Sequence, residues 1–190
     1  MNDNSYHEIN FERRDFSGTD LSGKEFESCE FLDCNFSESN LSGNEFIDCQ
    51  FNNCNLSTVN FNNVSLKGVD FFNCKLTGTD FGACNDFLFA VNFENCLLDY
   101  TFFKNNSLEN TKFTDCIIKD ANFTESDLKK ALFLNCDLLN TVFIQNNLSG
   151  ADFRTSYNYS IDPELNKIKG AKFSYPGLSG LLDKYDIVVE

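Results

Sequence analysis

A bulky apolar residue recurs at every fifth position through most of this chain. A second period of twenty is superimposed on the first, as in the spacing of Cys34, Cys54 and Cys74. Neither a helix, with 3.6 residues per turn, nor a flat strand, with a period of two, generates a spacing of five. The two periods together predict a repeat protein whose chain coils with four sides, five residues to a side, and whose coils stack on one another.

The five-residue phase runs from Phe11 to Phe81 and then resumes two residues late, which we place at Leu88. With a two-residue bulge near 84–87, the sequence can be wrapped at twenty along its whole repetitive part. On one side the large apolar position is phenylalanine in every coil. This position is expected to form a core ladder of Phe11, Phe31, Phe51, Phe71, Phe93, Phe113, Phe133 and Phe153. A second column is expected to hold buried cysteines, namely Cys34, Cys54, Cys74, Cys96, Cys116 and Cys136.

The cysteines are interpreted as part of the core. Their number, nine, is odd, and eight of them occupy the same repeat position beside large apolar residues. A cysteine in that setting behaves as a small buried hydrophobe. Cys84 lies in the bulge, outside that position, and is expected to be the most reactive thiol. We therefore predict no metal site, no cofactor and no disulfide framework.

The sequence favours a protein that is not an enzyme. His7 is the single histidine and precedes the repeats, so no histidine-based catalytic pair can be built within them. The carboxylates fall at outward positions of a regular convex surface, without an evident pocket that would shift their pKa values. No catalytic residue is predicted.

The charge is strongly negative and unevenly distributed. Acidic side chains outnumber basic ones by 29 to 15, which excludes the basic stripe that nucleic-acid binding requires. Residues 1–66 hold 12 acidic and three basic side chains, whereas residues 154–190 hold five of each. The N-terminal half is therefore expected to attract a basic protein partner. Candidates for this acidic surface are Asp15, Asp20, Glu25, Glu30, Glu45, Asp70 and Asp80.

The C-terminal part has a different character. After Phe153 the repeats give way to a loop excursion that turns at Asp162-Pro163, a partial last coil, a short amphipathic helix from Pro176, and a tail at 186–190 that could form a strand. Apolar residues at outward positions usually mark an interface. We expect a set of such residues near the C-terminal end either to be covered by the chain's own C-terminus or to form a dimer or partner surface. The set is Leu132, Leu134, Leu139, Val142, Ile144, Leu178, Leu181, Leu182 and Tyr185.

Individual repeats carry a family resemblance. Segments such as Ser39-Asn40-Leu41-Ser42-Gly43 and Ala121-Asn122-Phe123-Thr124-Glu125 resemble the A(D/N)(L/F)xx unit of pentapeptide-repeat proteins. The resemblance covers residues 9–155, with 1–8 as a lead-in and 156–190 as a C-terminal segment. It implies an all-β fold, a right-handed quadrilateral β-helix of about eight coils at ~4.8 Å spacing, with a short C-terminal helix and tail.

The resemblance also implies a function. Members of the quinolone-resistance branch resemble B-form DNA in shape and charge and bind type II topoisomerases, and their C-terminal helical region makes a homodimer. By this resemblance the chain is expected to be a DNA mimic that binds DNA gyrase or topoisomerase IV, modulates quinolone sensitivity and dimerises through its C-terminal end. It departs from the resistance proteins with long projecting loops, because its repeats are interrupted by only two residues.

The alternative is a scaffold or regulator with an unrelated protein partner. In neither case do we expect direct contact with nucleic acid or membrane. The N-terminus lacks a signal-peptide pattern and no segment approaches the length of a membrane span, so the sequence predicts a cytoplasmic protein.

Overall fold

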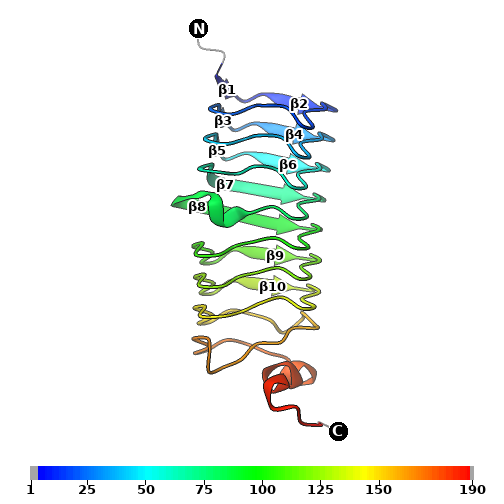
Figure 1. Cartoon of the computed structure of the whole chain (residues 1–190), viewed down its shortest axis with the longest axis vertical. Coiled ribbons are helices and arrows are strands. Elements are labelled where there is room, and N and C mark those ends of the chain that lie inside the picture. Colours follow the sequence, from blue (N-terminus) through cyan, green and yellow to red (C-terminus); the bar gives the residue numbers. More distant parts are fainter. Residues whose placement is uncertain (1–3, 189–190) are drawn as a thin grey trace.

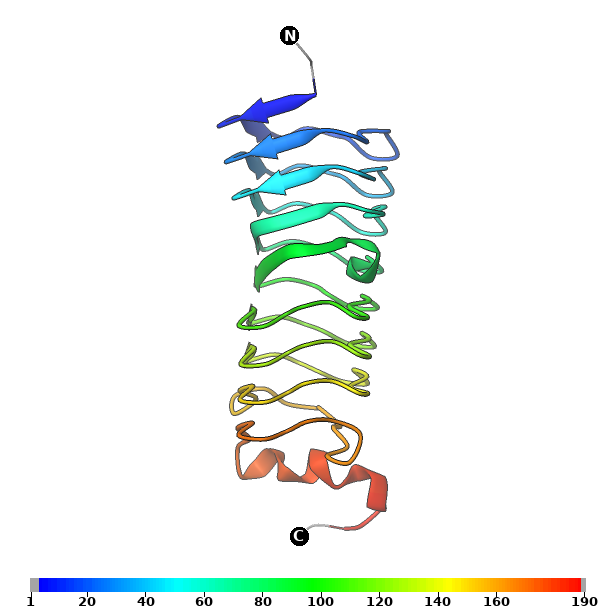
Figure 2. The ribbon, with the colours of Figure 1, turned by 90° about the vertical axis from the view of Figure 1, so that its left-hand side faces the viewer.

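The computed structural model describes residues 4–188 of the chain. These residues form a rod of stacked coils with the two ends of the chain at opposite ends of the rod (Figure 1). Figure 2 shows that successive coils lie directly over one another along the whole rod. The four-sided β-solenoid that the repeats predict is confirmed.

Each coil has four sides, and each side is built around one large inward residue. In the second coil these residues are Phe31 on side 1, Phe36 on side 2, Leu41 on side 3 and Phe26 on side 4, all of them buried. Residues twenty positions away belong to the same side. This numbering of the sides is used below.

All strand pairing is parallel, and most strands occupy sides 4 and 1. Side 4 carries β1 (Ser5–His7), β3 (Glu25–Glu27) and β5 (Glu45–Ile47). Side 1 carries β2 (Asn10–Glu12), β4 (Glu30–Leu32), β6 (Gln50–Asn52), β9 (Lys112–Thr114) and β10 (Leu132–Leu134). Both sides are crossed by β7 (Ser65–Phe72) and β8 (Asn85–Glu94). In the described part of the chain, three short 3₁₀ helices complete the fold, η1 (Phe81–Ala83), η2 (Pro176–Leu181) and η3 (Asp183–Tyr185).

Isolated bridges hold sides 2 and 3 and show why a period of twenty in the sequence becomes a column in space. One column on side 2 runs through Asp15, Asn35, Asn55, Lys75, Leu97, Ile117, Asp137 and Tyr157. Each coil donates to the next, as Phe16 N–H does to the Asn35 carbonyl at 2.7 Å. The coil count differs slightly from the expected eight. The first coil is only partly buried, and a partial coil follows Phe153, bridged by Asn147–Lys167 and Asp152–Lys172.

The corners between sides require left-handed backbone. The second residue after most of the large inward residues has positive φ, for example Gly43 at 68°, Asn53 at 53° and Asn135 at 56°. Glycine and asparagine tolerate this region better than other residues. The Gly and Asn residues at these positions of the sequence therefore make the corners of the coil.

The core is a continuous stack of aromatic rings. On side 1 successive rings stack in nearly parallel planes, as for Phe31 and Phe51, whose centroids are 4.6 Å apart. Rings on neighbouring sides meet edge to face, as for Phe113 and Phe123 at 5.9 Å and 88°. Both geometries are favourable for aromatic pairs. Of the ladder, Phe11 alone is only partly buried, because it lies in the first coil.

One prediction about the bulge is wrong. Leu88, expected in the core, is 64% exposed, and Phe89 is buried at 7% in its place. The pairing of β7 with β8 shifts register between Ser65↔Asn85 and Lys67↔Ala90, so four residues of β8 lie opposite Leu66. Only one of these four can point inward, and the register places Phe89 there.

The C-terminal segment also differs from the sequence prediction. Tyr157 continues the column of side 2, and Tyr159 and Ile161 are buried against the last coil, so residues 157–161 are not a loop that leaves the stack. The predicted helix is present as η2 and η3, which are 3₁₀ rather than α-helical. Residues 186–188 form no strand, and residues 189–190 of the predicted tail strand lie outside the described residues. Within residues 4–188, no helix is long and apolar enough to cross a bilayer.

Candidate protein-interaction surfaces

The predicted acidic residues lie on all four sides of the rod, because the outward position just before the large inward residue recurs once on every side. Glu30 and Asp70 are on side 1, Asp15 on side 2, Asp20 and Asp80 on side 3, and Glu25 and Glu45 on side 4. The structure therefore does not gather them into one patch. It distributes them around the axis of the N-terminal half.

On sides 2 and 3 the carboxylates are held by hydrogen bonds. Asp15 accepts from the Ser17 side chain at 2.7 Å and from the Asn35 amide of the next coil at 3.1 Å. Asp20 accepts from the Asn40 amide in the same way at 3.0 Å. The hydrogen bonds from Ser17 and Asn35 lower the pKa of Asp15, so it stays ionised at neutral pH.

Side 4 brings predicted acidic residues into adjacent coils. Glu25 and Glu45 are register partners in β3 and β5, one coil apart. Like charges so placed repel each other, and the Lys67 ammonium pairs with Glu45. Glu27 lies on the same strand as Glu25, with its Oε2 3.2 Å from Nδ1 of His7.

The start of β8 projects from the side of the rod on side 4 (Figure 1). Here Phe87 and Leu88 are 65% and 64% exposed, more than any other large apolar side chain within residues 9–155. Sequence reasoning missed this feature because it placed Leu88 in the core. The run Phe87-Leu88-Phe89 was the available signal, since three consecutive apolar residues cannot all point inward in an extended chain.

A second exposed apolar area covers parts of sides 2 and 3 in the C-terminal half. Leu97 and Ile117 are neighbours on side 2, and Phe102 and Val142 belong to one column on side 3. The equivalent positions in the N-terminal half are polar, such as Asn35. We call this area the apolar flank, and it consists of Leu97, Phe102, Ile117, Leu139, Val142 and Ile144.

The residues predicted for a dimer or capping surface are separated by the fold. Leu139, Val142 and Ile144 belong to the exposed apolar flank, whereas Leu132 and Leu134 lie half-buried on side 1. In the C-terminal helices, Leu181 packs against the core. Leu178, Leu182 and Tyr185 remain exposed on η2, at its end and on η3, respectively.

The structure places the cysteine column in the core. Each thiol of the column is buried, and Cys54 Sγ donates to the Phe31 carbonyl of the preceding coil at 3.3 Å. Burial raises the pKa of Cys49, in the neighbouring column, to about 11. Cys84 is half-buried, and burial together with the nearby Asp80 carboxylate raises its pKa strongly. This shift runs against the prediction that Cys84 is reactive, because the thiolate is the nucleophile.

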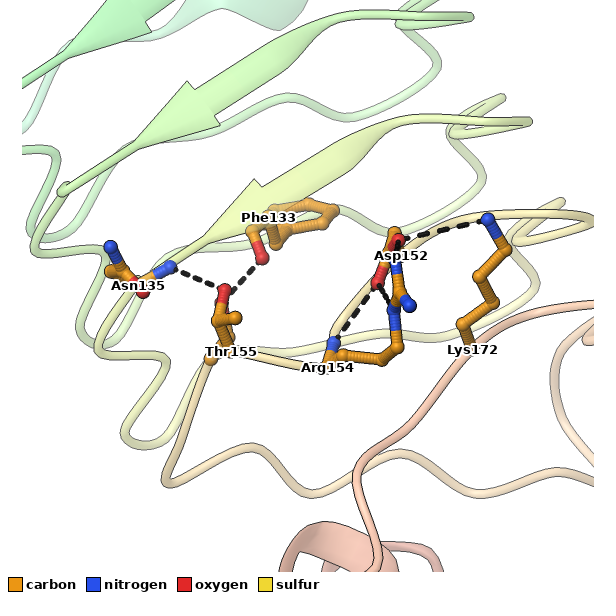
Figure 3. A network of polar contacts seen from close by, with 7 residues as sticks. Phe133, Asn135, Asp152, Arg154, Thr155 and Lys172 are labelled. Atoms are coloured by element: carbon orange, nitrogen blue, oxygen red, sulfur yellow. Dashed lines mark hydrogen bonds and ion pairs between the residues drawn. The ribbon is translucent and has the colours of Figure 1, made fainter.

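A polar network closes the last full coil (Figure 3). Asp152, whose side chain is 7% exposed, accepts from Arg154 Nε at 2.9 Å and Nη2 at 2.7 Å, and the Lys172 ammonium is 3.7 Å away. The hydrogen bonds from Arg154 lower the pKa of Asp152. On the neighbouring corner, Thr155 Oγ1 accepts from Asn135 N–H at 2.9 Å. These contacts tie the partial last coil to the body of the rod.

A cavity of about 540 Å³ lies between this coil and η2. Its wall includes Tyr157, Tyr159, Ser174 and Gly177. A Cβ atom on Gly177 would come within 2.0 Å of the Tyr159 hydroxyl, so glycine is needed for η2 to lie against the ring. The cavity thus borders the contact by which the C-terminal helices cover the end of the aromatic core. Within residues 4–188, no three His, Cys, Asp or Glu side chains are arranged to hold a metal ion.

Comparisons with known proteins agree with this geometry. A family model described as pentapeptide repeats (9 copies) matches residues 26–70, and one described as pentapeptide repeats (8 copies) matches residues 7–43, 88–124 and 121–156. No curated protein sequence matches the chain significantly.

One solved structure shows the same fold. QnrB1, a plasmid-mediated fluoroquinolone resistance protein, has a TM-score of 0.62 and 20% sequence identity, over 96% of this chain and 100% of that chain. HetL, a pentapeptide repeat protein involved in heterocyst differentiation regulation from the cyanobacterium Nostoc sp. strain PCC 7120, has a TM-score of 0.47 and 14% identity, over 91% of this chain and 90% of that chain.

Proposed function

Because the chain belongs to the pentapeptide-repeat family, we propose that it is an acidic rod which binds a protein partner in place of DNA. The partner proposed is a type II topoisomerase, DNA gyrase or topoisomerase IV, and binding would modulate quinolone sensitivity. QnrB1, which shares the fold, is a fluoroquinolone resistance protein, and this supports the choice of partner. Such a partner would place the protein in the cytoplasm, in a role that is not enzymatic.

The observation that carries this proposal is the placement of carboxylates on all four sides of the N-terminal half. A duplex presents phosphates all around its axis, whereas an ordinary acidic patch faces one way. The hydrogen bonds to Asp15 and Asp20 hold two of these carboxylates in position and lower their pKa values. A mimic of DNA needs charges that are both fixed in space and ionised at neutral pH.

The charge density is compatible with partial mimicry. From Asp15 to Tyr157 the column on side 2 has seven register steps, which at ~4.8 Å each give a length of ~34 Å. A DNA duplex carries about 20 charges over that length. Residues 15–157 hold 21 acidic and nine basic side chains, a net charge of −12. The rod thus has the sign of DNA at roughly three fifths of its charge density.

The test is the affinity for purified gyrase at two salt concentrations, together with a supercoiling assay. We expect binding that weakens steeply with salt, since exposed charges are screened. Replacing Glu25→Gln and Glu27→Gln should weaken binding more than the matched pair Asp183→Asn and Asp186→Asn near the C-terminus. No effect on supercoiling or on quinolone inhibition at micromolar protein would refute the proposal.

A second candidate function is a scaffold or regulator with an unrelated partner, and the apolar flank favours it. Such a partner would bind with little dependence on salt and would lose affinity when Ile117 or Val142 is replaced by Asp. We also propose that the C-terminal end forms a homodimer, supported by exposed Leu178, Leu182 and Tyr185 on the covering helices. The molecular mass in solution tests it, and a monomer at micromolar concentration would contradict it.

A further inference from the structure

The most exposed apolar side chains of the rod body occur where the twenty-residue register is interrupted. Opposite Leu66 of β7, β8 supplies the four residues from Asp86 to Phe89. Phe89 takes the inward position, and Phe87 and Leu88 are left outside at 65% and 64% exposure. An isolated exposed leucine needs no explanation. Two adjacent large apolar residues on the side of the rod that carries Glu25, Glu27 and Glu45 do.

The backbone holds Leu88 in a fixed and unfavourable conformation. Leu88 has a φ of 59° and is the only aliphatic residue with positive φ within residues 4–188. Residues with a Cβ are disfavoured there by roughly 1–2 kcal/mol. The strands on either side impose the conformation, and the Asn85 side chain accepts from Phe87 N–H at 3.0 Å. Positive φ occurs throughout the rod at corners that carry mostly polar residues or glycine, and at Leu88 it fixes an apolar side chain on the outside.

Lys67 orients the aromatic ring. Its ammonium lies 5.8 Å from the centroid of Phe87 and is paired with Glu45. A cation over the face of an aromatic ring is attracted to it. Phe87 is therefore restrained before any partner arrives, which lowers the entropy that binding must overcome.

The neighbours on side 4 determine what kind of partner would fit. The register Glu25↔Glu45↔Ser65↔Asn85 leads along one column to the start of the projecting segment. At ~4.8 Å per coil, Glu45 is about 10 Å along the rod from it and Glu25 about 15 Å. A partner that covers both must combine a basic surface with an apolar pocket beside it.

We propose that Phe87 and Leu88 form an apolar anchor that enters a pocket beside the basic surface contacted by Glu25, Glu27 and Glu45. The inference rests on the proposed function and assigns side 4 as the side of the rod that binds. The carboxylates supply attraction and orientation, and the anchor supplies slow dissociation, because buried aromatic residues dominate interface energies.

The test compares two matched double variants in binding to purified gyrase. Phe87→Ser with Leu88→Asn removes the anchor while keeping a residue that tolerates positive φ, and Phe102→Ser with Val142→Ser removes exposed apolar residues from side 3. We expect the first pair to lower affinity at least ten-fold through faster dissociation, with an unchanged salt dependence. The second pair should bind like the wild type, and Phe87→Tyr with Leu88→Met should restore binding.

The possible results distinguish a failure of the anchor from a failure of the proposed function. A wild type that does not bind gyrase overturns the proposed function and the anchor with it. A wild type that binds, with the Phe87→Ser, Leu88→Asn variant binding equally well, overturns the anchor and leaves the function standing. Thermal unfolding of both pairs is measured first, and Phe87→Ala alone replaces the anchor variant if that variant is unstable.

Discussion

Replacing Phe113 by alanine should be far more damaging than the same change at Phe11, although the two residues occupy the same column. Phe113 is fully buried and stacks on Phe93 at 5.2 Å and on Phe133 at 4.8 Å. It also meets the edges of two rings on side 3. Phe11 is partly buried and stacks on one ring, Phe31, at 5.0 Å, while it meets Tyr6 and Phe26 edge to face.

The magnitudes follow from these contacts. A buried Phe→Ala change costs about 3–5 kcal/mol, and the four aromatic contacts of Phe113 place it in the upper part of that range, at about 4–5 kcal/mol. For Phe11 the half-buried ring and the freedom of the end coil to relax give about 2 kcal/mol. Phe113→Leu, which keeps most of the volume, should cost about 1–1.5 kcal/mol.

The assay is urea unfolding followed by circular dichroism, with the three variants and the wild type compared at equal protein concentration. If the slopes of free energy against urea concentration differ between variants, part of the stack unfolds separately. The variants are then compared by the urea concentration at the midpoint of the transition. If Phe113→Ala costs no more than Phe11→Ala, the ladder does not stabilise the rod through stacking in its interior, and the reasoning is refuted.

Three further predictions concern the C-terminal contact, the thiols and the dependence on pH. Gly177→Ala should lower the melting temperature and increase proteolysis after residue 173, because the new Cβ would meet the Tyr159 hydroxyl. Gly43→Ala is the control for general destabilisation, because its Cβ is strained by the positive φ but meets no atom within 4 Å and lies far from the C-terminal helices; equal proteolysis after residue 173 in both variants would contradict the prediction. Cys49 should resist iodoacetamide at pH 8 until the protein is unfolded, because burial raises its pKa to about 11, and labelling of the native protein would contradict this. Because the pKa of Asp152 is lowered in the folded state, its contribution to the free energy of unfolding is present above the unfolded pKa of about 3.9 and is lost as the pH falls through the folded pKa. The melting temperature of the wild type should therefore fall below pH 4, and that of Asp152→Asn should fall less. An equal fall with pH in the two proteins would argue against this prediction.

The repeat made most of the fold predictable. The large apolar residue at every fifth position, the small residue two places before it and the Gly or Asn at the corner each have one position in the coil, so local and long-range preferences agree. The sequence predictions fail where local and long-range preferences no longer agree. At Leu88 the period could be resumed in more than one way, and the sequence does not show which of three consecutive apolar residues points inward. At Tyr159 and Ile161 there is no repeat, but the open aromatic end of the stack still has to be covered.

The candidate surfaces were less predictable than the core. The period of twenty already puts Asp15 and Glu25 on different sides, but it does not show which carboxylates are held in place, as Asp15 is by Ser17 and Asn35. Leu139 and Leu178 were expected to act together, but one lies on the flank of the rod and the other on the covering helices.

By itself the sequence determined the solenoid, its four sides, its buried ladder of phenylalanine and its acidic N-terminal half, because a period of five repeated at twenty can satisfy the backbone and bury the apolar residues in only one regular way. The tertiary structure decided where the outward residues meet. The register of β8 against β7 exposes Phe87 and Leu88, and the packing of η2 on Tyr159 covers the end of the rod. Both depend on contacts between segments that are not periodic, and for these the repeat carries no information.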